Sequence, residues 1–451
     1  MLTTHSKDIP IWLLLIGIVL VLMRNSLLAE GMFLDGASYA SISRNMAEGQ
    51  GTFWNPYYTQ TLYPEFRQHP PLALGMEALF FKVLGDHLYV EKIYSVLTFL
   101  LSGLLLVLIW KRTTGQQHYA WLPLLFWVAM PLVTWCATNN LLENTMTMFV
   151  LLSVWLILLS YQKSNKLWIV PSGIALLAAF LSKGFTGLFP LVFPILYCIF
   201  DDQHRWFHGL VDTLLLLGTM AVLSGVMFWG FPSSFTYLKE YINLQVIGGG
   251  LHEATTNTRF FIVTSLLSQL IAPMVVLSII LIIDKIYNKE KHNLFDGSPD
   301  KRRSLLFLLF GLTGVLPIMV SVKQRDFYML AAMPFFALAF AHFSLPLLKK
   351  MPLALGSNLH KWMTIGASCI LLTGIVLNLS HIGTYDRNED FLKEMKSALK
   401  EIPENEVIAI SPEDFTQWTW HAYFMRYGKV SLDDQQPHQH HFSYHPQPTN
   451  P

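Results

Sequence analysis

Residues 93–110 read IYSVLTFLLSGLLLVLIW, eighteen consecutive residues without a charged side chain. An apolar run of roughly 18 or more residues is long enough to cross a bilayer as a helix. We place a span at 88–110 around this run, and similar runs before and after it predict ten more. These further spans lie at 11–29, 119–136, 143–161, 168–183, 185–200, 207–231, 260–284, 304–322, 326–347 and 361–379. The expected fold class is an all-α polytopic membrane protein with about 11–13 transmembrane helices.

The composition agrees with this fold class. Of the 451 residues, 53% are hydrophobic and 14% are charged, whereas soluble domains have about 25% charged residues. The formal net charge of +1 provides no basic surface that would indicate nucleic-acid binding. The bilayer and its lipids are therefore the partners expected from composition.

Basic residues determine the expected orientation, because cytoplasmic loops are enriched in Lys and Arg. If the N-terminus is inside, the loop between the spans at 260–284 and 304–322 places six basic residues in the cytoplasm. The loops that contain Lys111 and Lys163 fall on the same side. We expect a multi-pass protein of the inner (plasma) membrane with a cytoplasmic N-terminus.

Two long loops of the transmembrane domain (1–380) then face the exterior, at 30–85 and 232–259. Residues 71–85, within the first loop, are apolar but too short to span a bilayer. They predict a juxtamembrane helix that lies on the membrane surface.

The chain after residue 380 is also exterior in this orientation. Residues 381–435 predict a small soluble α/β domain, with helical spacing at 390–400 and 414–425 and a strand at 407–410. The polar, Pro- and His-rich residues 436–451 are expected to form a disordered tail.

Two carboxylates lie at the exterior ends of predicted spans. Asp35 follows the first span and begins a short helix that carries Tyr39 and Arg44, and Glu143 begins the fourth span. Capping of a helix N-terminus would explain either acid on its own. An ionisable group near membrane depth is costly, however, and usually has a partner or a function.

Cations gather at the same face. Lys183 lies in a turn between two spans, where snorkelling to the interface would also explain it. Lys323, Arg325 and Tyr328 lie at the exterior end of the ninth span and the start of the tenth, and positive charge there runs against the orientation rule. Such cations suit an anionic substrate such as a phosphate, with Asp or Glu as the general base. His252 in the second exterior loop would bind the phosphate, act as a base, or have no role in the site.

Five segments together resemble a known family. They are FLDGASYASISRNMAEGQGTFWNP (33–56), HPPLALGMEALFFKVLG (69–85), LLENTMTMF (141–149), LSKGFTGLFPL (181–191) and SVKQRDFYMLAAMPFFALAFA (321–341). In order and spacing they resemble the membrane glycosyltransferases of the C superfamily, in the branch of the lipid A aminoarabinose transferase and the protein O-mannosyltransferases. The resemblance covers most of the first 345 residues.

The resemblance implies an inverting transfer of a sugar from a polyprenyl-phosphate donor, at the exterior face, to a lipid, protein or polysaccharide acceptor. Asp35 would be the general base, and Glu143 would help hold the acceptor or a metal. The leaving phosphate would be neutralised by Lys183, Lys323 and Arg325, with a hydrogen bond from Tyr328. Fixed cations there stabilise charge that develops in the transition state.

The chain departs from the lipid A branch at two places. Gln68 and His69 replace a common Glu-Lys pair, and Gly36 replaces a common Glu after the aspartate. His69 would contact phosphate if it were protonated. A divalent metal is thus possible but not indicated.

The rival function is a transporter or flippase of lipid-linked sugars, which would bind the same phosphate without cleaving the donor. Transporters place broken helices and charges near the bilayer midplane. Here the charges gather at one face, which favours the enzyme. The identity of the sugar and of the acceptor stays open.

Overall fold

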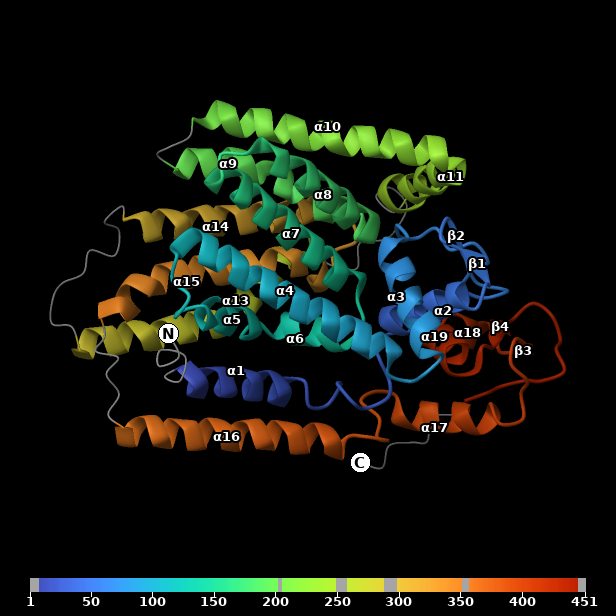
Figure 1. Ribbon diagram of the computed structural model, residues 1–451. Coiled ribbons are helices and arrows are strands. Elements are labelled where there is room, and N and C mark those ends of the chain that lie inside the picture. The colour runs from blue at the N-terminus through green and yellow to red at the C-terminus, as the bar shows by residue number, and fades with distance from the viewer. Residues whose placement is uncertain (1–7, 202–204, 249–257, 288–297, 351–356, 445–451) are drawn as a thin grey trace.

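A computed structural model describes residues 8–201, 205–248, 258–287, 298–350 and 357–444, and it is mostly helical (Figure 1). In chain order the elements are α1 (Ile9–Leu22), α2 (Leu34–Ala47), β1 (Gly51–Thr52), β2 (Asn55–Pro56), α3 (Leu72–Leu84), α4 (Val90–Thr114), α5 (Trp121–Val128), α6 (Pro131–Thr138), α7 (Leu142–Gln162), η2 (Lys166–Trp168), α8 (Ile169–Lys183), η3 (Phe185–Val192), α9 (Phe193–Phe200), α10 (Trp206–Gly230), α11 (Pro232–Tyr241), the π-helix η4 (Ile242–Gly248), α13 (Phe261–Tyr287), α14 (Pro299–Val315), η5 (Leu316–Val320), η6 (Asp326–Ala332), α15 (Met333–Lys350), α16 (Ser357–Ser380), α17 (Glu389–Ala398), β3 (Val407–Ala409), α18 (Pro412–Phe415), α19 (Trp418–Gly428) and β4 (Ser431–Asp433).

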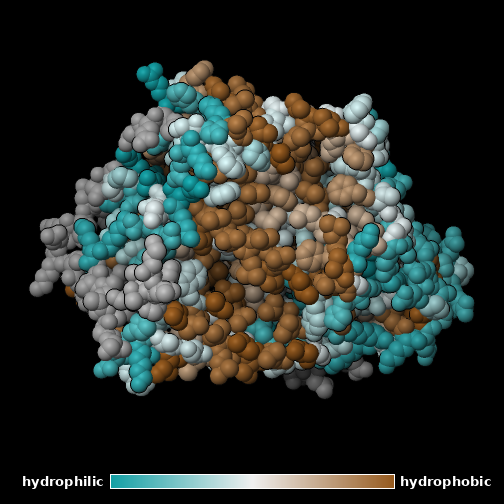
Figure 2. Space-filling view, viewed as in Figure 1, coloured by the Kyte–Doolittle hydropathy of each residue, from teal (hydrophilic) through white to brown (hydrophobic). Residues whose placement is uncertain are grey.

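Long apolar helices dominate the bundle. In the described part of the chain, eight helices are long and apolar enough to cross a membrane, and the bent pair α5–α6 makes a ninth if it counts as one span. The predicted spans at 11–29 and 185–200 correspond to the shorter apolar helix α1 and to η3–α9. Figure 2 shows the resulting apolar band between two hydrophilic ends. The prediction of a polytopic helical membrane protein is confirmed.

The predicted span at 119–136 is not a straight helix. It bends by 80° between α5 and α6. Pro131 occupies the first turn of α6, and Met130 before it has extended backbone angles (φ −79°, ψ 114°), as expected for a residue that precedes proline. The Leu132 amide, freed by the break, donates a 2.8 Å hydrogen bond to the Gln269 side chain. The break therefore leaves no unpaired amide at this position.

One end of the bundle gathers the elements that lie outside the apolar band. The juxtamembrane helices α2 and α3, helix α11 and the C-terminal elements lie together there, whereas α1 starts at the opposite end (Figure 1). Helix α3 is the helix expected at 71–85. Helix α2 packs between α3 and α19, so both helices determine its position.

The C-terminal elements form a compact unit against α2. Strands β3 and β4 pair in parallel, and their core joins Leu392 of α17 and Phe424 of α19 with Ala37 of α2. The helix expected at 414–425 is instead two helices, α18 and α19. Because α2 contributes to the core of this unit, the C-terminal unit also helps to hold α2.

The disordered tail predicted at 436–451 does not begin at 436. Phe442 is buried, and its amide donates a 3.0 Å hydrogen bond to the carbonyl of Ala409 in β3. The aromatic side chain completes the core of the C-terminal unit, an apolar contribution that the surrounding polar residues conceal in the sequence. Residues 445–451 lie outside the described residues.

Candidate active site

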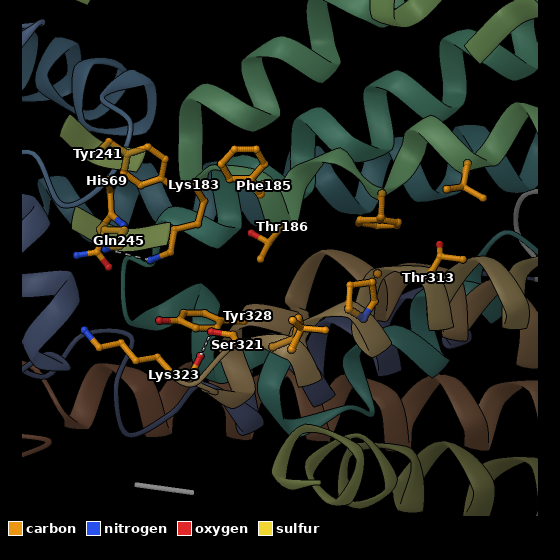
Figure 3. A pocket seen from close by; sticks show the side chains of 16 residues that line it. His69, Lys183, Phe185, Thr186, Tyr241, Gln245, Thr313, Ser321, Lys323 and Tyr328 are labelled. Carbon is orange, nitrogen blue, oxygen red and sulfur yellow. Dashed lines mark hydrogen bonds between the residues drawn. The ribbon is translucent and has the colours of Figure 1, made fainter. Parts of the chain in front are cut away.

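An elongated cavity of about 540 Å³ lies beside the juxtamembrane helices. One end is polar, lined by His69, Lys183, Tyr241, Gln245, Lys323 and Tyr328, and the other is mostly apolar (Figure 3). Val192 and Val320 also line the cavity, and they are 38% and 86% exposed. The cavity thus joins charged side chains to apolar side chains that are exposed on the surface of the bundle.

Lys183 occupies the centre of the polar end because helix α8 stops there. Gly184 follows it with a φ of +96°, a conformation that only glycine adopts without strain. A Cβ atom at Gly184 would collide with the Tyr241 hydroxyl. The glycine therefore both ends the helix and lets α11 approach the lysine.

The Lys183 ammonium contacts three polar groups. Its Nζ lies 3.2 Å from Glu143 Oε1, and it donates to the Tyr39 hydroxyl at 3.2 Å and to His69 Nε2 at 3.4 Å. Burial, with Lys183 and Lys323 nearby, holds the pKa of His69 well below its usual value. The lowered pKa favours the neutral imidazole, which accepts from Lys183 through Nε2. That His69 contacts phosphate stays a prediction.

Asp35 lies in the first turn of α2 and does not cap it, because the N-cap residue is Phe33. Burial raises the pKa of the Asp35 carboxyl, and the charges of Lys183 and Arg325 oppose that rise. In the described part of the chain, no side chain donates a hydrogen bond to this carboxylate. Both features suit a group that accepts a proton from a substrate hydroxyl.

The structure brings most of the predicted residues together. Lys323 and Tyr328 line the cavity, and the Tyr328 ring centroid lies 5.7 Å from Lys183 Nζ. Arg325 is exposed just before η6, outside the cavity lining but near enough to act on Asp35.

One predicted residue that the structure describes does not join the group. Arg44 is buried at the other side of α2, where it donates to the carbonyl of Arg426 and lies 3.7 Å from Asp86. It links α2 to the C-terminal unit and does not line the cavity. His252 lies outside the described residues.

The site also contains residues that the sequence analysis did not select. Tyr241 of α11 and Gln245 of η4 line the polar end, and Gln245 bonds to Gln68 of the first loop. The sequence predicts an exterior loop for their segment, although Tyr237 and Tyr241 are spaced by one helical turn. That spacing was a signal for a helix with one aromatic face.

The position of Gly36 explains why this chain lacks the Glu that commonly follows the aspartate in the lipid A branch. A Cβ atom there would collide with the carbonyl oxygen of Asn139, so the close contact between α2 and the end of α6 excludes a larger residue. Among the described residues, no group of three or more His, Cys, Asp or Glu side chains is placed to hold a metal ion.

Comparisons with known proteins agree with this geometry. A family model described as dolichyl-phosphate-mannose-protein mannosyltransferase matches residues 68–229. The undecaprenyl phosphate-alpha-4-amino-4-deoxy-L-arabinose arabinosyl transferase 2 of Proteus mirabilis is 26% identical over 198 residues, or 43% of this chain. The aligned part spans 34% of that relative's length.

Solved structures show the same fold. ArnT from Cupriavidus metallidurans in the apo state has a TM-score of 0.62 at 14% identity, covering 93% of this chain and 84% of that one. The same protein bound to undecaprenyl phosphate has a TM-score of 0.64 at 13% identity, covering 94% and 85%. The resemblance predicted from the sequence motifs is confirmed.

Proposed function

We propose that this chain is a membrane glycosyltransferase of the C superfamily, and that it transfers a sugar from a polyprenyl-phosphate donor to an acceptor hydroxyl at the exterior face of the membrane. The observation that carries the proposal is the cavity itself. It joins a buried ammonium beside a carboxylate to an apolar channel that reaches the lipid-facing surface. A lipid-linked phosphate has the matching chemistry, since its head is anionic and its tail is apolar.

The donor would lie along the cavity. Its phosphate would occupy the polar end near Lys183 and Lys323, and the first isoprene units would pass Phe189 and Pro317 toward the bilayer. All three donor hydrogens of Lys183 already face protein groups. Phosphate binding would therefore replace one of these contacts, and His69, the most distant of the three, is the partner most easily exchanged.

Transfer would proceed by attack of the acceptor oxygen on the anomeric carbon as the bond from that carbon to the phosphate oxygen breaks. The acceptor proton passes to Asp35, and polyprenyl phosphate leaves with the bonding electrons. Negative charge grows on the phosphate in this step, so Lys183 and Lys323 stabilise the transition state more than the bound donor. One displacement of this kind inverts the anomeric configuration.

Glu143 has a supporting role in this proposal. Its carboxylate is fully buried and lies against Lys183, so it keeps the ammonium charged and fixed at the polar end. A buried ion pair of this kind is costly to form, and placing a cation where charge develops is the benefit that explains it. Holding the acceptor or a metal is not needed to explain its position.

The expected orientation places this end of the bundle outside. Helix α1 begins at the opposite end, where the basic loops of the sequence are expected. Asp35, the cavity mouth and the C-terminal unit would then face the exterior of the inner membrane, with the acceptor arriving from that side.

Turnover in proteoliposomes tests the proposal against the flippase. Purified protein is reconstituted with a polyprenyl-phosphate sugar labelled in the sugar and with a membrane lipid extract as the acceptor source. A glycosyltransferase releases free polyprenyl phosphate and moves the label to an acceptor, and Asp35→Asn abolishes both. Donor that crosses the bilayer intact, at equal rates in wild type and Asp35→Asn, would support the flippase instead.

A further inference from the structure

Glu77 is a buried acid that the proposed reaction does not use. It lies on α3, is 1% exposed, and is surrounded by α2, α4 and the turn before α7. Its Oε2 accepts a 2.8 Å hydrogen bond from Ser43 of α2, and its Oε1 accepts a 2.7 Å bond from Asn140. Because both hydrogen bonds are buried, they fix the positions of α2 and of the turn before α7 relative to α3.

Asn140 connects Glu77 to the helix that carries Asp35. Its Nδ2 also lies 3.3 Å from the carbonyl oxygen of Gly36, which is the residue after Asp35. Asn140 has a φ of +50°, in the left-handed region that asparagine tolerates better than most residues. The residue thus forms a tight corner whose side-chain amide is directed at both α2 and α3.

The preceding residue makes a second contact with the same turn. Asn139 Oδ1 accepts a 2.9 Å hydrogen bond from the Phe33 amide, one of the amides at the N-terminus of α2 that have no partner within the helix. Its carbonyl oxygen packs directly against Gly36. The residues on both sides of Asp35 are therefore attached to one corner.

The same corner leads into Glu143. Helix α7 begins at Leu142, and Glu143 lies three residues after Asn140. The distance between the Asp35 carboxylate and the Glu143–Lys183 pair therefore depends on how α2 sits on this corner.

We infer that Glu77 and Asn140 are positioning residues that hold the Asp35 turn of α2 against the Asn139–Asn140 corner, and so set Asp35 relative to Lys183. Like Asp35, neither residue is part of the cavity lining, and both would act through the position of the α2 turn. The inference rests on the proposed role of Asp35 as the base. A misplacement of about 1 Å at such a site costs about 100-fold in rate.

The charge state of Glu77 is consistent with this role. Burial raises the pKa of Glu77 to about 8; Glu91 adds to the rise, whereas Ser43, Asn140 and Arg426 oppose it. The positioning function does not require a charge, only an acceptor for the Asn140 amide. Glutamine keeps that acceptor and the shape of the side chain, and leucine removes the acceptor at nearly the same volume.

Four variants test the inference in single-turnover assays on detergent-purified protein preloaded with labelled donor. Glu77→Gln should cleave the donor within about threefold of wild type, and Glu77→Leu should lose about 100-fold in the rate with donor affinity unchanged. Asn140→Gly keeps the positive φ and removes the amide, and it should lose rate to the same extent. Asn378→Ala is the control, since Asn378 is also a buried asparagine with main-chain partners but joins α16 to α1.

The outcomes separate the inference from the proposed function. If wild type cleaves the donor and Asp35→Asn does not, yet Glu77→Leu and Asn140→Gly match Asn378→Ala, the inference is wrong and the proposed function stands. A loss of donor affinity in Asn140→Gly with a normal cleavage rate would also overturn it. If wild type fails to cleave the donor, the proposed function and the inference are both wrong. Should Glu77→Leu not fold, Asn140→Gly decides alone.

Discussion

Lys183 Nζ lies 3.2 Å from Glu143 Oε1, and the two side chains are only 5% and 0% exposed. The pair joins the C-terminal end of α8 to the first turn of α7, at the point where the cavity is most polar. Neither oxygen of Glu143 has a well-aligned hydrogen bond among the described residues. The carboxylate is therefore balanced mainly by the charge of Lys183, and the two residues depend on each other.

Removing one partner should destabilise the protein more than removing both. Lys183→Met leaves a buried carboxylate without its cation, and we expect it to lose about 3–5 kcal/mol of unfolding free energy. The double variant Lys183→Met, Glu143→Gln should recover most of that loss in a thermal melt, because no uncompensated charge remains. Activity should stay absent in both, since the phosphate-binding ammonium is gone. Equal stability of the single and double variants would show that the pair is not coupled.

The charge of Arg325 should affect the pH dependence of the reaction. Because Arg325 and Lys183 lower the pKa of Asp35 against the rise caused by burial, Arg325→Gln should raise that pKa further. The base then becomes protonated at higher pH. The acid limb of the kcat/KM profile should therefore move upward, by roughly 0.5–1 unit.

The control for this experiment is Arg303→Gln, which removes a cation that lies 3.7 Å from Asp300, away from Asp35. An acid limb that stays in place in Arg325→Gln, or that moves equally in Arg303→Gln, would argue against Asp35 as the titrating base.

Glu77 should make the stability of the protein depend on pH. Its pKa rises from 4.5 to about 8 on burial, so the folded state binds the proton more tightly than the unfolded state. Stability then falls as the pH rises from about 4.5 to about 8 and changes no further above that. Glu77→Gln removes this dependence. The Tm of the variant relative to wild type should increase across that window; a constant difference would contradict the raised pKa.

Arg426 should hold the C-terminal unit on the bundle. Its guanidinium donates to both Glu91 oxygens, at 3.0 and 2.9 Å, and to Asp86 at 2.8 Å, and it is 3% exposed. Arg426→Ala should cost about 3–5 kcal/mol and make the chain after residue 380 sensitive to protease.

Lys393→Ala is the control for Arg426, because it removes an exposed ion pair with Glu389 within α17. Water and salt screen an exposed pair of this kind, so its loss should change stability little. Protease resistance in Arg426→Ala equal to that of Lys393→Ala would show that the ion pairs do not fasten the unit.

The spans were predictable because hydrophobicity is a local property of the sequence. Every predicted span has a helical counterpart among the described residues. The bend of 80° at α5–α6 departs from the predicted straight span, and it follows from Pro131, whose effect on Met130 is also local. By contrast, Phe442 is held in place by a core that distant segments form together. The polar composition of residues 436–451 does not reveal this core contact.

The site was predictable only in part. Asp35, Glu143 and Lys183 were selected one by one as costly charges, but the sequence does not show that the last two pair. Arg44 was selected because it shares a helix with Asp35. Nine residues at about 100° each place it on the opposite face, whereas Tyr39, four residues on, stays on the same face. Glu77 was missed because an acid inside an amphipathic helix normally faces water.

The central claim is that Asp35 takes the acceptor proton while the donor phosphate leaves, and a single-turnover measurement tests it most directly. Wild type and Asp35→Asn are loaded with a radiolabelled polyprenyl-phosphate sugar, donor binding is measured, and acceptor extract is added. We expect equal donor affinity and a rate of polyprenyl phosphate release that is about 100- to 10,000-fold lower in Asp35→Asn. Release at the wild-type rate in folded, donor-bound Asp35→Asn would contradict the account.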